Sequence, residues 1–115
     1  MDFIVLDKNI SQLGEGLCVN YKCGIISWVD IRNNKISYLI PKKNQYKTFN
    51  YSCCVSQIFY CDTKQAIFLG EKGIFYFSWE DQTTSKIYDL TKIIGESFRS
   101  NDGIMLSPNN FLFGV

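Results

Sequence analysis

The chain has 115 residues, which is room for one domain (1–115) with a core of modest size. Hydrophobic residues make up 46% and charged residues 20%, which excludes a disordered chain, and a net charge of +1 gives no electrostatic reason to expect binding to nucleic acid or to an anionic membrane surface. No apolar run approaches the length of a membrane span and the acidic start MDFIVLDKNI does not resemble a signal peptide, so we expect a cytoplasmic protein.

Short segments rich in β-branched and aromatic residues follow one another along the chain, with polar turns such as RNNK and PKKNQ between them. The window 88–98 comes nearest to a helical period and predicts at most one short turn of helix. The chain is therefore predicted to be all-β, an antiparallel meander. Its predicted strands, in order, are 3–6, 17–21, 24–31, 36–40, 46–51, 56–61, 66–70, 73–79, 86–90, 103–106 and 111–115.

The meander contains an internal repeat. Residues 23–39 (CGIISWVDIRNNKISYL) and 64–79 (KQAIFLGEKGIFYFSW) both predict a strand, a turn and a strand, and they start about 40 residues apart, near the repeat length of a propeller blade. Residues 103–115 begin a further unit. Closed propellers need about four to eight blades. We therefore expect two to two and a half blades of a β-propeller, fewer than a closed propeller needs.

The absence of histidine limits the chemistry that the chain can perform. It excludes Ser–His and Cys–His nucleophilic pairs, imidazole acid–base catalysis and His-ligated zinc. The five cysteines are an odd number, and the adjacent pair Cys53–Cys54 suits neither a disulfide framework nor a zinc site. We expect reduced thiols packed as small apolar residues. Redox activity at Cys53–Cys54 is the alternative, although the sequence places no cationic residue beside them.

Three motifs occur in a characteristic order: LGEG (13–16), WVDI (28–31) and FRSNDG (98–103), the last followed by LSPNNFLFGV. This order and spacing resemble the N-terminal part of the regucalcin/gluconolactonase family, also called the senescence marker protein family. The resemblance implies a six-bladed β-propeller with one divalent metal, most often calcium, that hydrolyses a sugar lactone or a related ester. The chain departs from the family pattern at Leu17, where the family has proline, and at Ser100, where it has an aromatic or apolar residue.

The resemblance also implies roles for three residues. Glu15 matches a metal ligand, and Arg99 and Asn101 match the pair that holds the substrate. These types suit the chemistry, because a hard cation takes oxygen ligands and polarises a carbonyl, while Arg and Asn orient a substrate by hydrogen bonds. The family's other metal ligands and its general-base aspartate belong to later blades, so no catalytic residue is assigned within this chain.

Read without the resemblance, the same residues have ordinary structural interpretations. Glu15 would be an exposed loop carboxylate, and Arg99 and Asn101 would be surface-turn residues before a glycine. In WVDI, Trp28 is expected in the core, and Asp30 is expected to accept hydrogen bonds from backbone donors at a strand end.

Two functions from different classes therefore remain open. The first is metal-dependent hydrolysis of a small-molecule sugar lactone. The second is a catalytically inactive propeller fragment that acts as a binding or self-assembling module, because open blades expose strand edges and apolar faces. In one form of self-assembly, a homo-oligomer of three two-blade chains would complete a six-bladed propeller.

Overall fold

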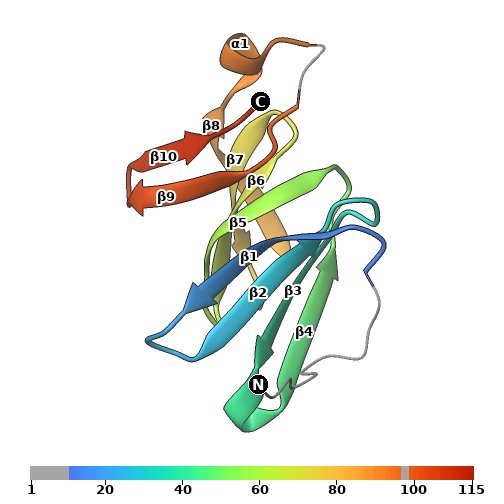
Figure 1. Cartoon of the computed structure of the whole chain (residues 1–115), viewed down its shortest axis with the longest axis vertical. Helices are drawn as coiled ribbons and strands as arrows, with labels where there is room; N and C mark the ends of the chain where they lie inside the picture. The colour runs from blue at the N-terminus through green and yellow to red at the C-terminus, as the bar shows by residue number, and fades with distance from the viewer. Residues whose placement is uncertain (1–10, 97–98) are drawn as a thin grey trace, which may run out of the picture.

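The computed structural model describes residues 11–96 and 99–115, and it is built almost entirely of strands (Figure 1). The predicted strand 3–6 and residues 97–98 lie outside the described residues. The elements are β1 (Gly14–Asn20), β2 (Ile25–Asp30), β3 (Lys35–Ile40), the 3₁₀ turn Pro41–Lys43, β4 (Gln45–Asn50), β5 (Val55–Cys61), β6 (Gln65–Gly70), β7 (Gly73–Ser78), β8 (Thr83–Asp89), α1 (Thr91–Ile94), β9 (Gly103–Ser107) and β10 (Asn110–Phe113).

The strands form three antiparallel groups in chain order: a first sheet β1-β2-β3-β4, a second sheet β5-β6-β7-β8 and a C-terminal hairpin β9-β10. Figure 1 shows them following one another along the length of the molecule. The first strands of the groups contact their neighbours, β1 with β5 and β5 with β9. The two predicted repeats correspond to the hairpins β2–β3 and β6–β7. The all-β prediction, with sheets that match partial propeller blades, is confirmed.

The main core lies between the first and second sheets. Successive residues of a strand point to opposite faces, so β2 buries Ile25 and Val29 toward the second sheet while Ile26 stays only half-buried. A smaller core joins the second sheet to the C-terminal hairpin. Its buried residues are Phe59, Leu69, Ile74, Leu90 and Ile94. Each group of strands is therefore packed mainly on its neighbour in sequence.

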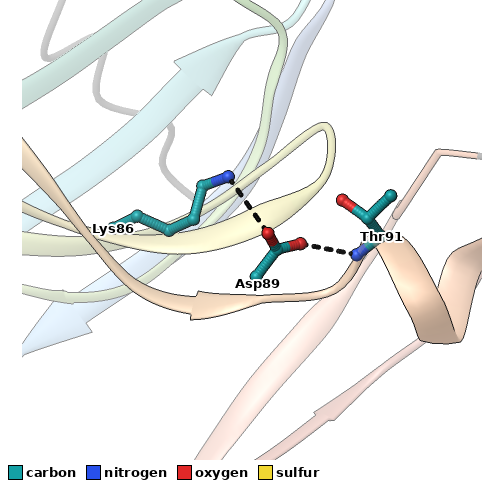
Figure 2. A network of polar contacts seen from close by, with 3 residues as sticks. All are labelled: Lys86, Asp89 and Thr91. Atoms are coloured by element: carbon teal, nitrogen blue, oxygen red, sulfur yellow. Dashed lines mark hydrogen bonds and ion pairs between the residues drawn. The ribbon is translucent and has the colours of Figure 1, made fainter.

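Strand β8 is exposed along its whole length, and its end is fixed by Asp89 (Figure 2). The backbone N–H of Thr91 donates to Asp89 Oδ1 at 2.9 Å, and Lys86 Nζ lies 3.7 Å from Asp89 Oδ2. Hydrogen bonds from Thr91 hold the pKa of the Asp89 carboxyl below its ordinary value. The single turn α1 follows at once and buries Ile94, so the expected short helical turn is confirmed within the described part of window 88–98.

No helix within residues 11–96 and 99–115 combines the length and the apolar character that a membrane span needs.

Candidate functional site

Strand β1 meets the start of β5 at Gly16, with backbone against backbone. Gly16 has a φ of 61°, in the left-handed region, and lies at an irregularity in the β1–β2 register. A Cβ atom added there would lie 3.1 Å from Gln57 Cα and 3.2 Å from the Ser56 carbonyl oxygen. Both the backbone angle and the lack of space require glycine at this position. Gly16 is therefore held against the first residues of β5. We call β1, β5 and β9, the first strands of the three groups, the inner strands.

Ser100 anchors the segment before β9 to the same place. Its side chain is buried, and its hydroxyl donates to the Gly70 carbonyl oxygen at 2.6 Å and lies 3.4 Å from Ser56 Oγ. Ser56 Oγ in turn donates to the Leu69 carbonyl oxygen at 3.3 Å. The departure from the family pattern at Ser100 is thus explained by a buried polar contact at the start of β5.

The inward position of Ser100 leaves Arg99 and Asn101 exposed on either side of it. The backbone N–H of Asn101 donates to the Gly114 carbonyl oxygen at 2.9 Å, and its side-chain amide donates to Asp102 Oδ2 at 3.3 Å. Arg99 Nη1 donates to Cys54 Sγ at 3.9 Å. The guanidinium is therefore held by the loop before β5.

The structure places Glu15, Arg99 and Asn101 at the same end of the three inner strands, separated by the start of β5. Glu15 is exposed, like the other two. Within the described ranges, no hydrogen bond or ion pair links Glu15 to Arg99 or to Asn101. The three residues share an end of the fold without touching, and their binding roles stay predictions.

Two small hollows lie beside these strand starts. One, of about 300 Å³, is lined by residues 14–17 and Trp28, so it includes Glu15. The other, of about 260 Å³, lies between β1, β5 and β9 and is lined in part by Leu17, Gln57 and Gly103. Both are at or below the lower limit of typical ligand sites. A larger hollow of about 600 Å³ lies at the opposite end, by the β1–β2 turn, away from all three predicted residues.

Ser56 and Gln57 are site neighbours that sequence reasoning missed. They occupy the start of β5, about one repeat after Glu15, and residues 99–101 precede the start of β9 about one repeat later. The sequence repeat of about 40 residues places Ser56 and Gln57 at the position in the second sheet that Glu15 occupies in the first. This repeat could have identified both residues.

The described residues do not by themselves form a metal centre. They contain no group of three or more His, Cys, Asp or Glu side chains placed to hold an ion. Glu15 supplies one carboxylate, whereas calcium takes six to eight oxygen ligands.

Asp30 anchors the segment that leads into Glu15. Its buried carboxylate accepts hydrogen bonds from the backbone N–H groups of Gln12 at 2.9 Å and Leu13 at 3.1 Å, and from the Asn33 side-chain amide at 2.7 Å. Burial raises the pKa of the Asp30 carboxyl, but the hydrogen bonds from Asn33, Gln12 and Leu13 outweigh burial and leave it below its ordinary value. The prediction that Asp30 satisfies backbone donors at a strand end is confirmed.

The prediction for Trp28 was wrong. Trp28 lies on the face of β2 opposite Val29, so it is half-buried instead of in the core, and its ring centroid is 6.0 Å from that of Tyr46. The cysteine prediction holds in part. All five thiols are free, and Cys61 is buried, but Cys23 and Cys53 are exposed.

Four-stranded antiparallel sheets whose first strands lie side by side define the chain as part of a β-propeller. The family model of the SMP-30/gluconolactonase/LRE-like region matches residues 13–115, and the chain belongs to this family. The resemblance noted in the sequence is thereby confirmed.

Two solved structures share the fold. One is a calcium-binding protein, regucalcin, from Agrobacterium tumefaciens strain C58, with a TM-score of 0.72 and 21% identity over 86% of this chain. Another is a luciferin-regenerating enzyme, with a TM-score of 0.70 and 19% identity over 81% of this chain. A search of curated proteins gives no match. The chain spans about one third of the length of each structure, 33% and 32% respectively.

Proposed function

We propose that the chain is part of a lactonase-type hydrolase that acts on a sugar lactone or a related ester with the help of a divalent metal, most simply calcium. The observation that carries this proposal is the family match over residues 13–115. The common location of Glu15, Arg99 and Asn101 at one end of the inner strands supports it. In this proposal Glu15 is one oxygen ligand of the metal, and its other ligands come from outside the described residues.

The proposed substrate-binding residues have the chemistry for a polyhydroxylated lactone. Arg99 carries fixed N–H donors, and the Asn101 amide has both a donor and an acceptor. Both side chains are exposed at the strand starts, beside a buried Ser100 that fixes the backbone between them. Because the backbone between them is fixed, the two side chains start from defined positions when they bind a substrate.

The test is hydrolysis of δ-gluconolactone by the chain assembled with the further blades that supply the remaining ligands, with Ca²⁺, Mg²⁺, Mn²⁺ and Zn²⁺ titrated separately. We expect turnover faster than spontaneous hydrolysis. This turnover should depend on the metal and should be lost in Glu15→Gln. Glu80→Gln is the matched control, because Glu80 is an exposed carboxylate in the turn after β7. An accompanying thermal melt should show a metal-dependent rise in Tm that Glu15→Gln abolishes and Glu80→Gln keeps. Absence of metal-dependent turnover with all four ions would overturn the enzymatic proposal for this chain.

A second candidate function rests on the exposed face of the C-terminal hairpin. Ile104, Leu106 and Leu112 are 56%, 67% and 62% exposed, although the opposite face of the same hairpin packs on the second sheet. An isolated two-stranded hairpin is marginal in water, and a contiguous apolar face indicates a binding surface. The alternative is therefore an inactive module that binds further sheets, including a homo-oligomer of three chains that completes a ring.

Light scattering at micromolar concentration distinguishes these states. The self-assembling alternative predicts a trimeric mass, and Leu106→Asp should reduce it to that of a monomer. A monomeric mass for the unmodified chain would exclude self-assembly without affecting the lactonase proposal.

A further inference from the structure

A hollow of about 460 Å³ lies between two turns of the first sheet, the β1–β2 turn and the 3₁₀ turn that joins β3 to β4. Figure 1 shows both turns at the lower end of this sheet, away from the starts of the inner strands. Small-molecule sites usually have volumes of about 300–1,000 Å³, so this hollow is large enough for a ligand. We call it the lysine hollow, and it is lined by residues 19, 21–24, 26 and 40–43.

The walls of the lysine hollow are apolar. Val19 and Ile26 are register partners in β1 and β2, and they lie on the face of the first sheet that does not pack on the second sheet. Val19 is 41% exposed, and Tyr21 in the adjoining turn is 90% exposed. Removing such apolar surface from water is favourable. A ligand with an apolar part would therefore gain free energy by covering these side chains.

The same hollow is lined by three lysines, Lys22, Lys42 and Lys43, and by no aspartate or glutamate. Within the described ranges, none of the three forms an ion pair with a carboxylate. The net charge of the whole chain is only +1, so this concentration of positive charge is local. A cleft lined by charges of one sign, with walls of low dielectric constant, concentrates ions of the opposite sign. The hollow is therefore suited to an anion.

The backbone of both turns is held in place. In the first turn, Asn20 Oδ1 accepts from the backbone N–H of Lys22 at 3.1 Å, and Asn20 Nδ2 donates to the Cys61 carbonyl oxygen at 3.1 Å. In the second turn, Asn44 has a left-handed backbone with a φ of 48°, and its N–H donates to the Pro41 carbonyl oxygen at 3.2 Å. The lysines thus extend from two fixed turns on either side of the apolar walls.

We propose that the lysine hollow binds a small amphipathic anion, a molecule with a short apolar chain or ring and one carboxylate or phosphate group. The apolar part lies against Val19, Ile26 and Tyr21, and the anionic group lies among the lysines. A free small molecule fits these observations better than a membrane surface does, because the hollow has the volume of a ligand site and the chain has almost no net charge. This site is separate from the end that carries Glu15, so it stands or falls independently of lactone hydrolysis.

The experiment titrates the ¹⁵N-labelled chain with octanoate and follows the amide resonances by NMR, with three matched ligands as controls. Octanoate should bind at least about tenfold more tightly than butanoate, because each buried CH₂ contributes to affinity. It should also bind about threefold or more tightly than octanol, and octyltrimethylammonium should bind more weakly still. The amides of Gly24, Lys42 and Lys43 should shift. Equal affinity for octanoate and octyltrimethylammonium would overturn the proposal.

The position of the shifts provides a second test. The larger hollow at the β1–β2 turn shares residues 19 and 21–23 with the lysine hollow, but it is lined in addition by Phe59, Tyr60 and Asp62. Shifts at residues 59–62 without shifts at residues 42–43 would place the ligand in the larger hollow and overturn the proposal. Association of the chain with vesicles of anionic lipid, without saturable binding of octanoate, would overturn it in favour of a membrane surface.

Variants test the role of the charges. Lys42→Gln/Lys43→Gln should weaken octanoate binding about threefold or more, since exposed ion pairs contribute modestly. The matched control is Arg32→Gln/Lys92→Gln, which removes two exposed positive charges that lie in the β2–β3 turn and in α1. This control and Glu15→Gln should both keep the original affinity. A thermal melt of each variant confirms that it is folded, and unchanged affinity in a folded Lys42→Gln/Lys43→Gln protein would refute the proposed site.

Discussion

Replacing Gly16 by alanine tests the close contact between β1 and β5, and Gly24 provides a matched control. Both residues have left-handed backbones, with φ of 61° and 65°. An added Cβ at Gly16 meets Gln57 Cα at 3.1 Å and the Ser56 carbonyl oxygen at 3.2 Å, whereas at Gly24 it meets nothing within 4 Å. The two substitutions therefore share the backbone cost and differ in the steric cost.

The expected loss in the free energy of unfolding is the sum of the backbone cost and the steric cost. A left-handed alanine costs about 1–2 kcal/mol, which is the whole loss expected for Gly24→Ala. At Gly16 the obstacle is backbone that cannot rotate away, and overpacking of this kind adds about 1–3 kcal/mol. Gly16→Ala should therefore reduce the free energy of unfolding by about 2–5 kcal/mol.

Urea denaturation of both variants, followed by fluorescence and circular dichroism, measures the difference. An equal loss in Gly16→Ala and Gly24→Ala would show that the starts of β1 and β5 are not in close contact. It would also remove the argument that Glu15 lies at the same end of the fold as residues 99–101, because Gly16 is the link between them.

The remaining predictions concern buried polar groups. Asp30→Ala should lower the free energy of unfolding, measured by urea denaturation, by about 2–4 kcal/mol. Each hydrogen bond to a charged acceptor is worth about 1.5–3 kcal/mol, and the losses at one site are not additive. A loss under about 0.5 kcal/mol would place Asp30 among ordinary surface carboxylates. Because the fold lowers the pKa of Asp30, its contribution is complete above the ordinary value of 3.8 and is lost as the pH falls through the folded value. Asp30→Asn should therefore show a shallower fall in stability as the pH falls below about 4, and parallel curves for the two proteins would refute this origin. Ser100→Ala should cost about 1 kcal/mol by removing a donor from the Gly70 carbonyl oxygen, and the double variant with Ser56→Ala should show non-additivity, which independent serines would not.

Strand positions were predictable because the apolar residues of this chain recur with the period of a strand and the turns are marked by Asn, Lys and Gly. Strand β5 was predicted at 56–61 and is Val55–Cys61. Strand β8 was predicted at 86–90 but is Thr83–Asp89. Its first residues are polar and exposed, so no apolar pattern marks the start of this outer strand. The start of β8 was thus not visible in the sequence, whereas the equally exposed outer strand β4, predicted at 46–51, is Gln45–Asn50.

The candidate site was only partly predictable. The motifs identified Glu15, Arg99 and Asn101, and the fold brings them to one end of the inner strands. The contact between Cys54 and Arg99 depends on how β5 and the segment before β9 pack, and no local pattern records a contact over 45 residues. Trp28 was misplaced for a related reason, since hydrophobicity alone does not reveal which face of a sheet a neighbouring sheet covers.

The packing of each group of strands on its sequence neighbour has a consequence for how such a chain can evolve. The first sheet and the C-terminal hairpin bury their side chains in separate cores, each shared with the second sheet. A mutation in one core can therefore be compensated by a second change in the same core. Duplication of a sheet adds a new interface and leaves the existing interfaces in place. Selection can then change exposed residues such as Arg99 and Asn101, while the buried contacts of Ser100 with Ser56 and Gly70 hold the backbone beneath them.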